Sequence, residues 1–244
     1  MGARGEWAPG YYISKAYPFI PISRIITPVH FESLYFDLDD TLYPASSGLW
    51  DAIRGRMNIY MQKFIDRPVD EIAKIRQQYL EQYGTTLRGL QAYYEVDTEE
   101  YLAFVHDLPL EEFIKPDPQL RQLILSLPQK RWIFTNSDRN HASRVLKILG
   151  LDDCFDGIID ILAVEFACKP DKAAYQKALQ IGRDDDPQRC VIFDDSLRNL
   201  APARELGFFT ILVGKNGSDP QVDRVIPSLH ELTHHLPELW EKAR

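Results

Sequence analysis

Short apolar runs alternate along most of the chain with longer segments in which apolar residues recur at helical spacing. Each run has about the length of a buried β-strand. The runs are Leu34–Phe36, Trp132–Phe134, Ile158–Val164, Val191–Phe193 and Phe208–Val213. Alternation of this kind predicts βαβ units, and therefore an α/β fold built on a parallel sheet.

Capping and terminating residues mark three helices between these runs. A helix N-terminus favours Ser, Thr, Asp or Asn as its cap or Pro in its first turn, and Gly favours its end. The predicted helices run from a cap at Ser137 or Asp138 to Gly150, from a first turn at Pro170 to Gly182, and from a cap at Ser196 to Gly207. A short helix is also expected in the tail, residues 227–244.

Residues 48–116 differ from the rest, because they show helical periodicity and no convincing strand. The sequence Lys115-Pro116-Asp117-Pro118 then breaks the pattern. We therefore expect a helical insertion at 48–116, between two parts of one α/β core at 31–47 and 117–244. Residues 1–30 carry four prolines and are expected to form a flexible N-terminal extension.

Composition narrows the classes of function. The 244 residues include 28 Lys and Arg against 36 Asp and Glu, which gives a formal net charge of −8. A broad cationic face for a nucleic-acid polymer is therefore not expected. No apolar run approaches the ~20 residues of a membrane-spanning helix, so no membrane partner is expected. Three cysteines without a CxxC pair are interpreted as buried thiols of a reducing cytoplasm.

Acidic residues follow two of the predicted strands. Asp37, Asp39 and Asp40 come directly after Leu34–Phe36, and the pair at 194–195 follows Val191–Phe193 in the same way. Ligands of parallel α/β sheets bind at the carboxyl ends of the strands. Carboxylates gathered there need a cation or a proton to coexist. Oxygen ligands without a His or Cys cluster favour Mg²⁺.

Two further strand ends carry groups that suit a phosphate. Thr135 and Asn136 end the run at Trp132–Phe134 and offer a hydroxyl, an amide and helix N-terminal N–H groups. Lys169 follows the run at Ile158–Val164 and can supply a positive charge. Each of these residues alone is more typical of a helix cap, a turn or a solvated surface. Their conjunction at four successive strand ends predicts a site for an anion and a hard cation.

The four strand ends together resemble the motifs of the haloacid dehalogenase-like hydrolase superfamily. The matching stretches are DLDDT at 37–41, IFTNSD at 133–138, CKPD at 168–171 and FDDS at 193–196. Longer stretches, such as DLDDTLYPASSGLW at 37–50, resemble its pyrimidine 5′-nucleotidase branch. The resemblance covers about residues 31–244. It implies a doubly wound, Rossmann-like core with an inserted helical cap.

The resemblance also implies a mechanism and a role for each site residue. Asp37 would attack phosphorus and form an aspartyl phosphate, and Asp39 would act as general acid and then as general base. Mg²⁺ would be held by the Asp37 carboxylate, the Asp39 backbone carbonyl and Asp194. Asp195 would lie in the outer shell, although the order of Asp194 and Asp195 stays open. Thr135, Asn136 and Lys169 would bind the phosphoryl oxygens.

The expected substrate is a small phosphorylated metabolite, with pyrimidine nucleoside 5′-monophosphates as the first choice. The alternatives are sugar or cofactor phosphates, a phosphomutase, or a non-catalytic ligand-binding protein on the same fold. Ser46, Ser47 and Gly48 would form the hinge at which the chain enters the cap. Arg88 and the tyrosines at 83, 93 and 94 are candidates for contacts with a base or sugar, although cap-core tyrosines are the more common case. The oligomeric state is open.

The tail contains a second motif, His230-Glu231-Leu232-Thr233-His234, which fits the HExxH pattern of zinc proteases. It follows the break at Pro227 and leaves little chain for a third ligand. We therefore interpret these histidines as surface residues of a helix.

Overall fold

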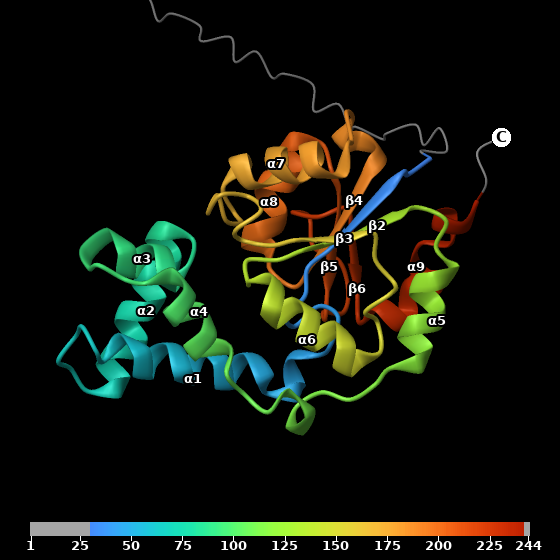
Figure 1. Cartoon of the computed structure of the whole chain (residues 1–244). Helices are drawn as coiled ribbons and strands as arrows, with labels where there is room; N and C mark the ends of the chain where they lie inside the picture. The colour runs from blue at the N-terminus through green and yellow to red at the C-terminus, as the bar shows by residue number, and fades with distance from the viewer. Residues whose placement is uncertain (1–29, 242–244) are drawn as a thin grey trace, which may run out of the picture.

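The computed structural model describes residues 30–241, whose centre is a sheet of six parallel strands (Figure 1). The strands are β1 (Ser33–Phe36), β2 (Lys130–Phe134), β3 (Gly157–Ile159), β4 (Cys190–Asp194), β5 (Phe209–Val213) and β6 (Arg224–Ile226). Their order in the sheet is β3-β2-β1-β4-β5-β6. The predicted parallel α/β sheet is confirmed, and the chain winds outward from β1 in both directions.

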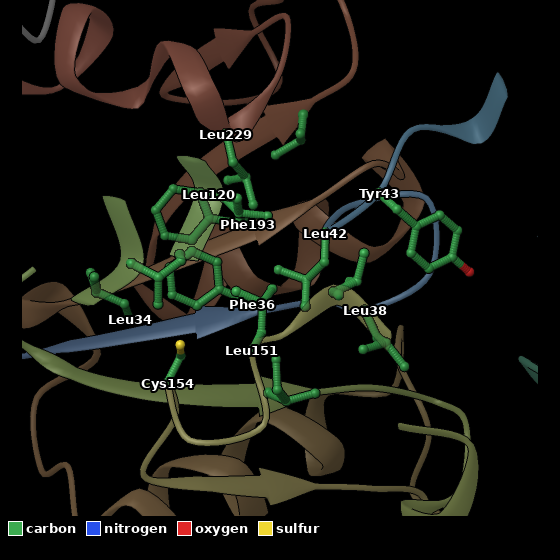
Figure 2. Packing of buried hydrophobic residues seen from close by; sticks show 14 of the residues in the cluster. Leu34, Phe36, Leu38, Leu42, Tyr43, Leu120, Leu151, Cys154, Phe193 and Leu229 are labelled. Carbon is green, nitrogen blue, oxygen red and sulfur yellow. The ribbon is translucent and has the colours of Figure 1, made fainter. Parts of the chain in front are cut away.

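Alternation along the central strands divides the apolar side chains between the two faces of the sheet. Leu34 and Phe36 belong to one buried cluster, and Tyr35 between them belongs to another. In Figure 2 the rings of Phe36 and Phe193 stack within the first cluster, with centroids 4.4 Å apart and an interplanar angle of 2°. Burial on both faces explains why these strands are continuous apolar runs in the sequence.

Helices cover both faces of the sheet, which makes the core doubly wound. The first cluster is closed by α5 (Pro118–Ser126), α6 (Arg139–Leu149) and α9 (Leu232–His235), and the second by α7 (Lys172–Gly182) and α8 (Leu197–Leu206). Figure 1 shows α5 and α9 on the side of the sheet opposite α7 and α8.

The helix boundaries differ in detail from the predicted ones. Asp138, not Ser137, caps α6, because its carboxylate accepts from the N–H groups of Asn140 and His141. Pro170 lies outside α7, whose cap is Asp171. Ser196 occupies the cap position of α8 but its hydroxyl makes no capping hydrogen bond.

Between β1 and α5 the chain forms four α-helices that lie beside the core (Figure 1). They are α1 (Leu49–Met61), α2 (Val69–Tyr83), α3 (Thr86–Tyr93) and α4 (Thr98–His106). These helices have a buried cluster of their own, built around Tyr60, Tyr79 and Tyr101. Phe166, from the loop after β3, packs against that cluster and joins the insertion to the core.

The run predicted as a strand at Ile158–Val164 is mostly not one. Strand β3 ends at Ile159, because the Asp160 carboxylate accepts from the N–H groups of Arg139 and Ala163 and turns the chain. The tail contains α9 with short helical turns on either side of it, in place of the one short helix expected, and an unpredicted three-residue strand, β6, comes directly before the tail. Residues 1–29, which are all of the predicted extension 1–30 except His30, lie outside the described residues. No helix within 30–241 is both long and apolar enough to cross a bilayer.

Candidate functional site

Strands β1 and β4 bring two carboxylates together at one edge of the sheet. The strands are parallel neighbours with Phe36 beside Phe193, and the Asp37 N–H donates to the Phe193 carbonyl at 2.9 Å. Asp37 follows β1 directly, and Asp194 is the last residue of β4. Both side chains are buried, Asp194 completely. The sheet register therefore sets the position of both acids.

Carboxylate oxygens of Asp37, Asp194 and Asp195 lie within 4.8 Å of one another. Burial, and then the charge of Asp194, raises the pKa of Asp195 to about 7. Burial is also the main reason that the pKa of Asp37 is raised, with Lys169 opposing and Asp194 adding to the effect. The three side chains offer only oxygen ligands, and their mutual repulsion makes full ionisation unfavourable unless a cation lies among them. Such a set fits a hard divalent ion. Among the described residues, no other group of at least three acidic, His or Cys side chains is arranged to hold a metal.

A buried lysine faces the same carboxylates. The Lys169 ammonium is 2.8 Å from Asp37 Oδ1 and 2.7 Å from Asp194 Oδ2, and the residue is only 1% exposed. Burial alone would lower its pKa, but Asp194 and Asp37 outweigh this and raise it. The lysine is therefore a fixed positive charge beside Asp37.

The loop that carries Lys169 is tied to the end of β2. The Asn136 side chain donates to the Lys169 carbonyl at 2.9 Å, and its Oδ1 accepts from the Lys169 N–H at 2.8 Å. Thr135 is buried, and its hydroxyl oxygen accepts from the Ser137 N–H at 3.0 Å. The Asn136 carboxamide thus holds the lysine loop in place, which leaves its backbone N–H for the role expected in phosphate binding.

The Asp39 carboxylate is not a member of the acidic cluster and has partners of its own. It accepts hydrogen bonds from the hydroxyls of Tyr43 at 2.6 Å and Ser137 at 2.8 Å, and it lies 2.8 Å from His141 Nε2. Burial would raise its pKa, but His141 and Tyr43 together lower it. The donors around this carboxylate therefore favour its ionised form. Figure 2 shows the Tyr43 hydroxyl turned away from the apolar cluster.

Two stacked histidines connect Asp39 with the helical insertion. His141, in the first turn of α6, stacks on His106 at the end of α4, with ring centroids 4.2 Å apart. His106 Nδ1 lies 2.7 Å from the Asp138 carboxylate. Burial lowers the pKa of His106 although Asp138 opposes it. Our sequence analysis missed both histidines. The one feature that could have indicated His141 is its position as a polar residue on the apolar face of α6.

The predicted cap candidates do not line the cleft between insertion and core. The tyrosine hydroxyls of 83 and 93 bond to each other at 2.9 Å on the exterior, and the Arg88 guanidinium contacts Cys168 Sγ at 3.5 Å. The cleft is lined instead by residues that include Trp50, Arg76 and Tyr101. Tyr83 and Tyr94 pack against the insertion's own apolar cluster instead, and none of the four candidates is among the residues that line the cleft.

The structure gives the HExxH motif no metal geometry. His230 lies in a 3₁₀ turn before α9 and contacts the Asp117 carboxylate at 2.9 Å, whereas His234 lies in α9. Both histidines are exposed, as we expected, but they do not share one continuous α-helix. The three cysteines are buried free thiols.

Comparisons with known proteins agree with this geometry. A family model described as haloacid dehalogenase-like hydrolase matches residues 33–207. Phosphate metabolism protein 8 of Saccharomyces cerevisiae is 34% identical over 188 residues, which are 71% of this chain. The match spans only 58% of the length of that relative.

Solved structures share the fold. A HAD phosphatase from Thermococcus onnurineus has a TM-score of 0.58 at 20% identity, over 84% of this chain and 97% of that chain. The putative HAD-hydrolase YfnB of Bacillus subtilis, bound to magnesium, has a TM-score of 0.57 at 20% identity, over 84% and 98%. At this level of identity, the similarity concerns the fold alone.

Proposed function

The chain belongs to the haloacid dehalogenase-like hydrolase family, and from that premise we propose that it is a Mg²⁺-dependent phosphomonoesterase. The observation that carries the proposal is the contact set around Asp37, in which one buried lysine touches both Asp37 and Asp194. A phosphate bound there meets a nucleophile, a fixed cation and an acidic cluster that fits a divalent ion. The named relative also carries phosphate metabolism in its name.

In the proposed reaction, an Asp37 oxygen forms a bond to phosphorus while the bond from phosphorus to the ester oxygen breaks. The product of this first step is an aspartyl phosphate and the free alcohol. Lys169, the Thr135 hydroxyl and the Asn136 N–H would bind the phosphoryl oxygens. When bound by Asp37, Asp194 and the Asp39 carbonyl, with Asp195 beside them, Mg²⁺ would neutralise charge between phosphate and carboxylates.

Asp39 is the proposed acid and base of the two steps. It would give its proton to the departing ester oxygen, and would then take a proton from the water that attacks the aspartyl phosphate. Its low pKa in the substrate-free protein suits the second step, because an ionised carboxylate can accept that proton. Approach of a phosphate dianion would raise its pKa and favour the first step.

Pyrimidine nucleoside 5′-monophosphates are the substrates that we propose, with sugar and cofactor phosphates as the alternative. The helical insertion shares a cleft with Asn136 and Ser137, which follow β2, and it would shield the reaction from bulk water. The buried free thiols agree with a cytoplasmic location for an enzyme of metabolite phosphates.

The test is phosphate release from uridine, cytidine, adenosine and guanosine monophosphates and from sugar phosphates, with Mg²⁺ and with a chelator. Asp37→Asn is the control, because it removes the nucleophile and keeps the shape. Preference for pyrimidine nucleotides, lost with chelator and in Asp37→Asn, supports the proposal. Preference for sugar phosphates would support phosphatase activity but refute the assignment as a nucleotidase. Failure of the folded protein to hydrolyse any phosphomonoester would refute both.

A further inference from the structure

His106 is a buried titratable residue of the insertion that the proposed reaction does not use. It ends α4 and is only 6% exposed. Its ring stacks on that of His141, with centroids 4.2 Å apart and an interplanar angle of 18°, and its Nδ1 lies 2.7 Å from the Asp138 carboxylate. Through these two contacts the insertion reaches the histidine that binds Asp39.

The His141 ring has a hydrogen-bond partner at only one of its nitrogens among residues 30–241. Nε2 lies 2.8 Å from Asp39 Oδ1, whereas Nδ1 is buried and makes no hydrogen bond. An ionised Asp39 carboxylate can only accept, so Nε2 carries the proton and donates the hydrogen bond. A histidine held at one nitrogen needs a second contact to fix the tilt of its ring, and a hydrogen bond at the other nitrogen usually supplies it.

His106 supplies this second contact in place of a hydrogen bond. Its ring covers one face of the His141 imidazole, and its contact with Asp138 Oδ2 fixes the His106 ring in turn. The other oxygen of the Asp138 carboxylate accepts from the His141 N–H at 3.0 Å. His106 and Asp138 together therefore hold both the ring and the backbone of His141.

The backbone of the insertion is held at the same place. Residues 106–108 are the returning segment, which leads the chain from α4 back toward the core. The Arg144 guanidinium, about one turn beyond His141 in α6, donates to the carbonyls of His106 at 2.8 Å and Leu108 at 2.7 Å. The stack between the two histidines therefore depends on the docking of the returning segment against α6.

We propose that His106 is a positioning residue for the acid and base of the reaction. It holds the His141 ring, and His141 keeps the Asp39 carboxylate in the orientation that proton transfer needs. Asp39 is thereby set for its role when the returning segment is docked on α6. The inference rests on the proposed phosphomonoesterase function. His106 itself takes no part in bond making or in proton transfer.

The test compares two leaving groups in the full chain with Mg²⁺. Nitrophenolate is a weak base and departs from p-nitrophenyl phosphate without a proton, whereas the alkoxide of an alkyl phosphate needs one. The alkyl phosphate is the nucleotide or sugar phosphate of the panel above that the wild-type protein hydrolyses fastest. The parameter kcat/KM covers the steps up to the departure of the alcohol, so it reports Asp39 as the acid.

His106→Asn removes the stacked ring and keeps an amide that can donate to Asp138. It should lower kcat/KM roughly 10-fold for the alkyl phosphate and less than about twofold for p-nitrophenyl phosphate, because a misplaced acid affects only the leaving group that needs a proton. His106→Phe keeps a ring over His141 and should recover kcat/KM for the alkyl phosphate to within about threefold of the wild-type value. His106→Leu gives the comparison with His106→Phe if His106→Asn does not fold.

A double variant tests whether His106 acts through His141. In the His141→Asn background, His106→Asn should lower kcat/KM for the alkyl phosphate by less than about twofold, because changes at two residues that act as one unit are not additive. His230→Asn is the matched control, since its imidazole also contacts an aspartate, Asp117 at 2.9 Å, but is exposed and lies before α9. It should leave both substrates unaffected.

Three outcomes in folded variants would overturn the positioning role while the phosphomonoesterase stands. They are equal losses for the two substrates, no loss for either, and additive losses in the double variant, which would indicate a separate contact of His106 with the substrate. Absence of turnover of every alkyl phosphate by the folded wild-type protein would instead refute the function on which the inference rests.

Discussion

Replacing Lys169 by Met should destabilise the metal-free protein in a way that depends on pH and on Mg²⁺. The ammonium is 1% exposed and lies between two carboxylates at 2.8 and 2.7 Å. Removing one partner of a buried ion pair costs about 3–5 kcal/mol, because the other partner stays buried without compensation. Here two acids lose their cation, and Asp195 lies within the same cluster.

The dependence on pH follows from the direction of the pKa shifts. Asp37 and Asp195 have raised pKa values in the folded protein, about 7 for Asp195 against an ordinary value of 3.8. Their protonated forms stabilise the fold at low pH, and that contribution is lost as pH rises through the folded pKa. In Lys169→Met the loss should therefore be larger near ~pH 8 than near ~pH 5.5, and Mg²⁺ should reverse part of it at the higher pH.

The assay is urea unfolding at both pH values, with and without Mg²⁺. Lys172→Met is the matched control, because Lys172 pairs with Glu205 at 2.6 Å on the exterior, where both side chains are more than half exposed. Such surface pairs contribute about 0–1 kcal/mol. Two outcomes would refute the reasoning. One is an equal loss of unfolding free energy in the two variants, and the other is a loss in Lys169→Met that does not depend on pH or Mg²⁺.

Three other predictions concern Asp39, the acidic cluster and the insertion. His141→Asn removes the 2.8 Å contact to Asp39 and should lower kcat roughly 10-fold or more with little change in KM, as measured by steady-state kinetics; an unchanged kcat would contradict this role. Mg²⁺ should raise the wild-type melting temperature more near ~pH 8 than near ~pH 5.5, because protons compete for Asp195; calorimetry that shows the reverse order would contradict it. Gly84→Ala should lower the free energy of unfolding in urea by about 1–3 kcal/mol, because Gly84 has a φ of +89° and an added Cβ would lie 2.8 Å from Cys168 Sγ. An unchanged free energy of unfolding would contradict this expectation.

The sheet and its acidic edge could be predicted from the sequence because they follow from local pattern. Strands buried on both faces give continuous apolar runs, and parallel strands end at a common edge. Asp37 and Asp194 therefore had to lie close together once β1 and β4 were neighbours. The same rule failed for the run at 158–164, where Ile161 and Val164 are buried by tertiary contacts after the strand has ended.

The partners of Asp39 could not be predicted, because they come from distant parts of the chain. His141 is 102 residues from Asp39, and His106 reaches the site only when the insertion folds back onto the core. The lining of the cleft was missed for a similar reason. Helical periodicity places Tyr83 and Tyr101 equally well on an apolar face. Only the packing of α4 against α1, and of α2 against α3, decides which hydroxyl is buried.

The central claim is that Asp37 becomes phosphorylated during turnover. The most direct measurement starts turnover with uridine monophosphate and Mg²⁺ and then quenches the reaction. The protein is next reduced with borohydride, and its peptides are sequenced by mass spectrometry. Reduction of an acyl phosphate converts the aspartate to homoserine. We predict homoserine at position 37 in the presence of substrate, and none without substrate or in Asp37→Asn. Sustained phosphate release with Asp37 unmodified, or with homoserine at another position, would contradict the account.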